Sequence, residues 1–180
     1  LGTNYLLVSG NSARYSRIFF NSDDQLQLYS GDSSWNSVQP ITNAKFRDIS
    51  AWYHIVLRID SNNGTAGDRL RLYVNSVEQT WATSPNITQN GGFTLLEAFA
   101  SPGYHAWGAN LAYYSANAFF SGYLAEVHYV DGQSLAPTEF GETDDNGIWI
   151  PKKYSDAHGN CGYYLDFTDS GNLGDNKASS

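Results

Sequence analysis

The sequence predicts an all-β protein, a two-sheet antiparallel β-sandwich made of many short strands. Several stretches alternate apolar and polar residues with a period of two, which is typical of half-buried strands. Only 16% of the residues are charged and 17 are glycine, a composition that favours turns over long solvated helices. The 180 residues, of which 41% are hydrophobic, show no repeat or linker, so we expect one domain over residues 1–180.

The first hairpin is predicted near the start of the chain. Residues 14–20 and 25–29 alternate in polarity and flank residues 21–24, a polar Asn-Ser-Asp-Asp cluster that favours a turn. In the second of these strands, Leu26 and Leu28 fall on one face. We therefore expect that face to point into the core.

A second hairpin is predicted in the middle of the chain. Residues 52–60 send Ile55 and Leu57 to one side, as expected for a long central strand. Residues 69–75 alternate in the same way after the turn-rich loop 61–67. The two stretches should pair antiparallel.

The last third is predicted to hold shorter elements. Residues 122–131 alternate again, and residues 148–150 and 163–167 are expected to be short strands between loops. Residues 134–140 contain a Ser, a Pro and an acid in the order of a helix start, but Gly141 ends the pattern at once. We expect one short helical turn there.

Charge and hydropathy bear on the kinds of partner. Eighteen acidic residues against ten basic ones give a net charge of −8, and no Lys/Arg cluster is present, so we expect no nucleic-acid binding. No apolar run reaches the roughly 18 residues of a membrane-spanning helix, so we expect no membrane insertion. The sequence starts without Met and stops at residues 177–180 in the middle of a segment, so we expect it to be part of a longer polypeptide.

Two segments resemble the concanavalin A-like and laminin-G-like jelly-roll families. Residues 52–60 and 70–75 resemble the "W-x-H-v … l-x-l-Y-v-N-G" hairpin of these families, with Ser76 in place of the usual Gly. Residues 120–127 resemble their "F-x-G-x-i-x-E-v" closing strand, and a short helix follows that strand. The resemblance implies one laminin-G-like jelly roll.

A narrower resemblance concerns the strings at residues 125–133, 140–143, 147–154 and 162–167. They are similar to laminin-G-like modules in structural proteins of tailed bacteriophages, particularly marine and cyanobacterial phages. This resemblance implies an extracellular place on the virion, in a tail fibre, a tailspike or a capsid surface protein. By analogy with phage fibres and spikes, it also implies a homo-oligomer, a trimer.

Two functions are compatible with such a module. In the first, it binds a host-surface glycan or receptor during host attachment, as a carbohydrate-binding lectin would. In the second, it decorates or cements the virion through contacts with other virion proteins. A large aromatic and amide patch would stay exposed in the first case and be covered by protein in the second.

Catalysis ranks below both. A glucanase on this fold needs an E-x-D-x-x-E-like strand, whose alternate positions place two carboxylates on one face. Glu126 and His128 share a face of the predicted strand, but the next residue on that face is Val130. We therefore expect no enzyme, with a glycan-cleaving enzyme as the weakest hypothesis.

Aromatic side chains in loop-like or loop-edge segments are the candidate ligand-binding residues, because a flat ring can stack on a sugar face. For each one, burial in the core or in a subunit contact is the alternative. An amide nearby would supply hydrogen bonds. The candidates are Trp35, Trp81, Tyr104, Trp107, Tyr113 and the amide of Asn110.

No cofactor is required by any of these hypotheses. Asp144 and Asp145 begin an Asp-Asp-Asn-Gly cluster whose oxygens could bind Ca²⁺, and calcium is frequent in loops of the resembled superfamily. The same cluster is also ordinary turn chemistry. Both interpretations stay open from sequence.

Overall fold

The computed structural model describes residues 3–10, 14–32, 37–91, 104–112 and 115–178. It divides into two compact units, Leu1–Ser121 and Gly122–Ser180, and each is described by itself. The described residues form antiparallel sheets with no α-helix, which confirms the all-β, antiparallel class. Two 3-10 turns are present in these ranges, η1 (Ala66–Asp68) and η2 (Pro137–Glu139).

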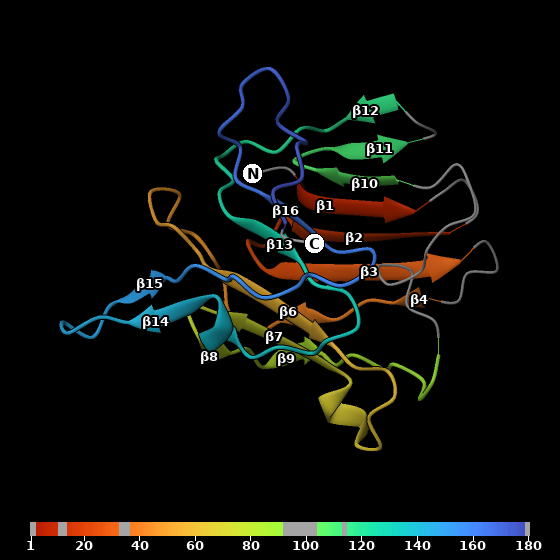
Figure 1. Ribbon diagram of the computed structural model, residues 1–180. Coiled ribbons are helices and arrows are strands. Elements are labelled where there is room, and N and C mark those ends of the chain that lie inside the picture. The colour runs from red at the N-terminus through yellow and green to blue at the C-terminus, as the bar shows by residue number, and fades with distance from the viewer. Residues whose placement is uncertain (1–2, 11–13, 33–36, 92–103, 113–114, 179–180) are drawn as a thin grey trace. The chain divides into compact units, whose positions relative to one another are not determined.

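The largest sheet belongs to the first unit, and its strands β10, β1, β2 and β3 run side by side in Figure 1. Its spatial order is β10-β1-β2-β3-β5-β9, with β4 paired to β3. The seven strands are β1 (Asn4–Gly10), β2 (Arg14–Phe20), β3 (Leu26–Asp32), β4 (Ser37–Val38), β5 (Ile41–Thr42), β9 (Trp81–Thr83) and β10 (Tyr104–Trp107).

The remaining described strands form smaller sheets. The first unit also holds β6 (Ile55–Ile59), β7 (Leu70–Val74) and β8 (Val77–Glu78) in one sheet, and β11 (Asn110–Ala112) with β12 (Ser115–Asn117) in another. The second unit consists of the pairs β13 (Val127–Tyr129) with β16 (Tyr163–Leu165) and β14 (Gly141–Thr143) with β15 (Trp149–Pro151).

The β2–β3 hairpin confirms the first predicted pair. The side chain of Asn21 closes its turn by accepting hydrogen bonds from the backbone N–H groups of Asp23 and Gln25, at 2.9 and 3.1 Å. Leu26 and Leu28 are 0% exposed, so their face of the sheet is the core face. Burial of each stabilises the fold by roughly 1.5–3 kcal/mol.

The β6–β7 hairpin confirms the second predicted pair, with Leu57 opposite Leu72. The strand is shorter than predicted, because β6 begins only at Ile55. The β7–β8 turn contains Asn75 and Ser76, both left-handed at φ 48° and 68°. A two-residue turn with two positive φ values fits the right-handed twist of the flanking strands and favours glycine at the second position.

In the second unit, the strand predicted over residues 122–131 is reduced to β13. Glu126 adopts φ 51°, a left-handed conformation that breaks the extended chain just before the strand. The predicted alternation of Glu126 and His128 along one strand is therefore wrong. The short helical turn expected over residues 134–140 is the three-residue η2, with Pro137 at its first position.

Candidate functional site

The face of the largest sheet opposite Leu26 and Leu28 carries a group of aromatic rings around one arginine, and Val8, which pairs with this arginine, is 1% exposed on the same face. The ladder registers place Tyr15 opposite Gly10 and Gly31, and Gly10 opposite Tyr104, so tyrosine and glycine alternate across four strands. Directly opposed residues of an antiparallel ladder share a face. We call this set the tyrosine platform, and it comprises Tyr5, Tyr15, Arg17, Phe19, Tyr29 and Tyr104.

Glycines lie between the rings, so the backbone there carries no side chains. A Cβ atom on Gly31 would lie 2.5 Å from the Tyr29 hydroxyl oxygen, so the Tyr29 ring lies across the place of the missing side chain. A Cβ atom on Gly10 would lie 2.3 Å from the backbone oxygen of Arg14. Both positions therefore need glycine, which allows rings to lie along the sheet.

The rings of the platform contact each other in two pairs. Tyr15 and Tyr29 stack with centroids 4.9 Å apart and planes inclined by 18°. Tyr5 and Phe19 pack at 5.5 Å with a tilt of 42°. Such pairs stabilise by about 0.5–1.5 kcal/mol beyond the area they bury. All four side chains are half-buried, so ring surface remains accessible on the sheet.

Arg17 lies between the two pairs. Its guanidinium carbon is 4.4 Å from the ring centroid of Tyr15 and 5.5 Å from that of Tyr5. Its Nε is buried and has no hydrogen-bond partner among the described residues. Two cation–π contacts thus hold this side chain, and its buried Nε–H is left without a partner among these residues.

The described candidates lie at the ends of strands, which fits the loop-edge positions expected for them but not positions inside loops. Trp81 lies in β9, Tyr104 and Trp107 lie in β10, and Asn110 lies in β11. These strands pair with strands distant in sequence, such as β10 with β1, and local polarity does not reveal such pairing. Two further candidates, Trp35 and Tyr113, lie outside the described residues.

The candidates do not gather on one surface. Tyr104 belongs to the tyrosine platform, whereas Trp107, opposite Leu7, falls on the other face of the sheet. Trp81 lies on the edge strand β9, five strand spacings or about 24 Å from β10. Of the aromatic candidates that the structure describes, only Tyr104 therefore contributes to the platform.

Asp144 organises the turn between β14 and β15. Its Oδ1 accepts hydrogen bonds from the backbone N–H groups of Asn146 and Ile148, at 2.9 and 2.8 Å. These bonds lower the pKa of its carboxyl group, the one from Ile148 most. Asp145 is exposed. Within the described ranges, no three His, Cys, Asp or Glu residues are grouped as a metal would require.

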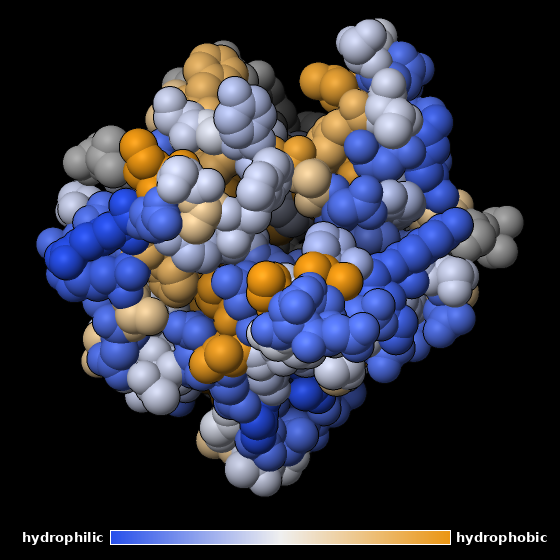
Figure 2. All heavy atoms as spheres, turned by 90° about the vertical axis from the view of Figure 1, so that its left-hand side faces the viewer, coloured by the Kyte–Doolittle hydropathy of each residue, from blue (hydrophilic) through white to orange (hydrophobic). Residues whose placement is uncertain are grey.

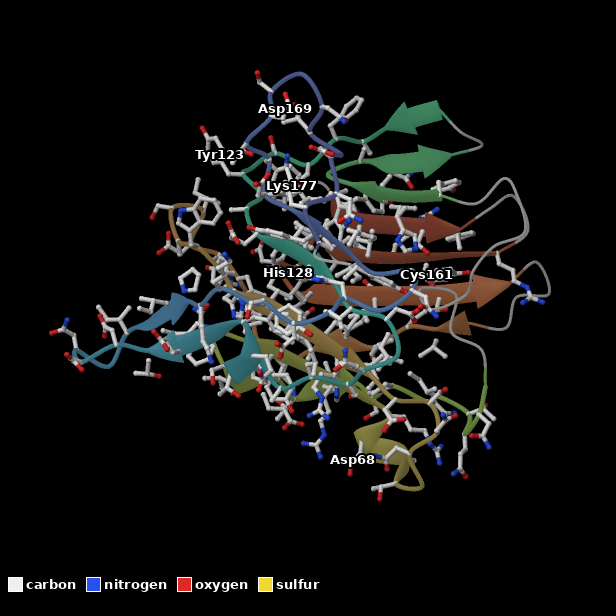
Figure 3. All side chains as sticks on the ribbon, viewed as in Figure 1. Asp68, Tyr123, His128, Cys161, Asp169 and Lys177 are labelled. Atoms are coloured by element: carbon white, nitrogen blue, oxygen red, sulfur yellow. The ribbon has the colours of Figure 1, made fainter. Side chains whose placement is uncertain are left out.

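The second unit contains a pair of histidines within a cluster of rings. His128, which projects from β13 (Figure 3), has its Nδ1 3.0 Å from Nε2 of His158. Its ring stacks on Tyr164 at 4.3 Å, and the ring of Tyr154 meets His158 edge-on at 5.1 Å. Burial lowers the pKa of His158, which is 3% exposed. One ring must donate and the other accept, so the contact requires at least one neutral histidine.

A carboxylate lies beside this pair. Glu126 Oε2 accepts a hydrogen bond from the Tyr164 hydroxyl at 2.7 Å and lies 4.0 Å from Nε2 of His128. Burial, followed by the contact with Glu126, raises the pKa of Tyr164 to about 12, so the phenol stays protonated as the donor. The two histidines, Tyr164 and Glu126 can each accept or donate a proton. Together they form a polar cluster in the second unit.

The tyrosine platform was not predicted from the sequence, although the sequence contains a pattern that indicates it. The positions that alternate with the core residues of β2 and β3 should be polar on a plain solvent face, yet they are Tyr15, Arg17, Phe19 and Tyr29. Aromatic residues and arginine are enriched at binding surfaces. Reading the outward positions of the predicted hairpin would have found four of the six platform residues.

Comparison with known proteins adds no further identification. The fold defines an all-β antiparallel protein, and the described residues contain no helix long and apolar enough to span a membrane. A scan against protein-family models and searches of curated proteins and of solved structures found no match to the chain.

Proposed function

We propose that the chain is a non-catalytic binding module on the surface of a bacteriophage virion, in a tail fibre, a tailspike or a capsid surface protein. The tyrosine platform would hold a glycan or receptor of the host surface. The observation that carries this proposal is the set of half-buried rings flanking Arg17 on the face of the largest sheet opposite Leu26 and Leu28. Aromatic rings on a concave or flat surface with a few polar groups are the usual means of holding a sugar.

The finer architecture belongs to this proposal. A jelly-roll sandwich of the concanavalin A-like class requires two sheets that each bury one face. Leu26 and Leu28 of the largest sheet are fully buried, as are Leu70 and Leu72 of the β6–β7–β8 sheet. This supports two sheets of the first unit packing through these leucines, which leaves the platform on the outer face.

A panel of bacterial glycans and host-envelope fractions tests the proposal. We expect saturable binding by the wild-type chain and at least a tenfold loss in Tyr15→Ala, in line with about 1.5 kcal/mol for a stacking ring. The matched control is Tyr123→Ala, since Tyr123 is 86% exposed, lies in the second unit and is labelled in Figure 3. Wild-type binding to no member of the panel would contradict the proposal.

The alternative, decoration or cementing of the virion, is favoured by one observation. Ile49 and Trp52, in the segment before β6, are 89% and 66% exposed. Apolar side chains on a surface often mark protein contacts. On the side of the molecule that Figure 2 shows, hydrophobic residues form small separate patches among hydrophilic ones. If an Ile49→Ser/Trp52→Ser variant fails to join the particle while glycan binding persists, the chain has both roles.

A further inference from the structure

The platform arginine differs from other arginines of the chain. Arg47 pairs with Asp24 at 3.3 Å, and Arg71 pairs with Glu78 at 2.8 Å. No ion pair within the described part of the chain involves Arg17, although the chain has 18 acidic residues. Among the described residues, the rings of Tyr15 and Tyr5 contact the Arg17 guanidinium, and no carboxylate pairs with it.

A guanidinium between two rings is prepared for one kind of ligand. The rings of Tyr15 and Tyr5 approach the cation at 4.4 and 5.5 Å and restrict its orientation. The rings contact the guanidinium carbon, and the buried Nε–H has no hydrogen-bond partner among the described residues. A planar fork of donors matches the two oxygens of a carboxylate.

From this geometry, and resting on the proposed function, we infer that the ligand of the platform is an anionic sugar that carries a carboxylate, a uronic-acid type of residue. Its carboxylate would accept two hydrogen bonds from Arg17. Its pyranose ring would lie on the rings of Tyr15 and Tyr29, which stack at 4.9 Å beside Arg17 on the same face. The net charge of −8 repels polyanions in general, so such binding would come from this local site.

The test compares acidic polysaccharides with their own neutral forms. Oligosaccharides of galacturonate, glucuronate and mannuronate are measured by calorimetry before and after chemical reduction of the carboxyl group, which leaves the sugar backbone unchanged. We expect at least tenfold weaker binding after reduction. A sulfated glucan serves as the second anionic arm, and we expect it to bind more weakly than the uronates.

Variants of the whole chain complete the test. Arg17→Gln should lose the preference for the acidic form, and Arg17→Lys should keep only part of it, because a lysine cannot donate in a fork. Arg47→Gln, which removes an exposed surface arginine, should bind like the wild type. Melting curves and circular dichroism of each variant separate lost binding from lost folding.

Three different results would overturn the inference. Equal affinity for acidic and reduced oligosaccharides would show that the site does not recognise the carboxylate, while the glycan-binding function would stand. A sulfated glucan that outcompetes every uronate would show that the site prefers a sulfate ester to a carboxylate. Binding to none of these oligosaccharides would remove the inference, and the proposed glycan function would fall only if no other member of the glycan panel bound either.

Discussion

Tyr15 and Tyr29 stack across β2 and β3 with their planes inclined by only 18°, and Gly31 makes this possible. The glycine lies directly opposite Tyr15, on the face across which the Tyr29 ring extends. A side chain at position 31 and the ring cannot occupy the same space. The flatness of the platform therefore depends on one missing methyl group.

Gly31→Ala should push the Tyr29 ring off the sheet. We expect a loss of about 1–3 kcal/mol in the free energy of unfolding, the usual cost of overpacking, together with a weaker near-ultraviolet circular dichroism signal from the stacked tyrosines. The control is Gly67→Ala, because a Cβ atom there meets no other atom within 4 Å. Equal stability of the two variants would show that the stack does not need the glycine.

Thr42→Val should leave the buried backbone N–H of Leu26 without a hydrogen-bond acceptor. The Thr42 hydroxyl is fully buried, accepts from the Leu26 N–H at 3.1 Å and donates to the Ala44 carbonyl at 3.0 Å. Its removal should cost about 1–3 kcal/mol in denaturant unfolding. Thr80→Val, at an exposed position, should stay within about 0.5 kcal/mol of the wild type. A Thr42→Val variant as stable as Thr80→Val would refute this role of the hydroxyl.

Ser76→Gly should stabilise the protein. Ser76 is held at φ 68°, which costs a residue with a Cβ about 1–2 kcal/mol, whereas glycine adopts it freely. After the entropy that glycine adds to the unfolded chain, we expect a gain of up to about 1 kcal/mol by thermal unfolding. Ser84→Gly, in an exposed extended segment, should give no gain. Destabilisation by Ser76→Gly would mean that the serine side chain makes a compensating contact.

His158 should make stability depend on pH. Burial lowers its pKa below the ordinary 6.5, so the unfolded chain binds the proton more tightly than the folded one. The free energy of unfolding should therefore fall as the pH drops below about 6.5, and should stop falling once the pH passes the lowered folded-state pKa. Urea titrations between neutral and acidic pH measure this slope.

The matched variants for this prediction are His158→Gln and His54→Gln. Burial also lowers the pKa of His54, in the first unit, so each histidine contributes its own part of the slope. His158→Gln should flatten the acid limb in part, and the double variant should flatten it further. An unchanged slope in His158→Gln would show that the histidine pair is protonated without cost.

Calcium should leave the stability unchanged. The Asp144 carboxylate already accepts two backbone N–H groups and the Asn146 side-chain amide, which accounts for its position as part of a turn. We expect the same melting temperature with millimolar calcium and with a chelator, and a lower one in Asp144→Ala. A melting temperature that rises with calcium in the wild type but not in Asp144→Ala would instead establish a calcium site.

The sequence predicted the fold where its information is local. Both hairpins follow from alternating polarity on either side of a polar turn, and the core positions of Leu26 and Leu28 follow from the same alternation. β1 was missed because its run from Asn4 does not alternate, and its partner β10 lies about a hundred residues further along the chain. Pairing over that distance leaves no periodic trace in either strand.

The sequence predicted the type of residue in the candidate site better than the positions of those residues. The platform consists of aromatic rings of the expected type, yet of the proposed aromatic residues that the structure describes, only Tyr104 lies on it. The platform arises from the register of four strands and from two glycines that make room for rings, and both are properties of the assembled sheet. The break before β13 at Glu126 is likewise a backbone conformation that alternation does not encode.

The most direct test of the tyrosine platform is a hydrogen-exchange footprint of the chain with its strongest glycan from the panel. Slower amide exchange on glycan addition should be concentrated in β1, β2, β3 and β10, and should vanish in Tyr15→Ala. Protection confined to β6–β8 or to the second unit, or none at all under saturating glycan, would contradict a binding surface on this sheet.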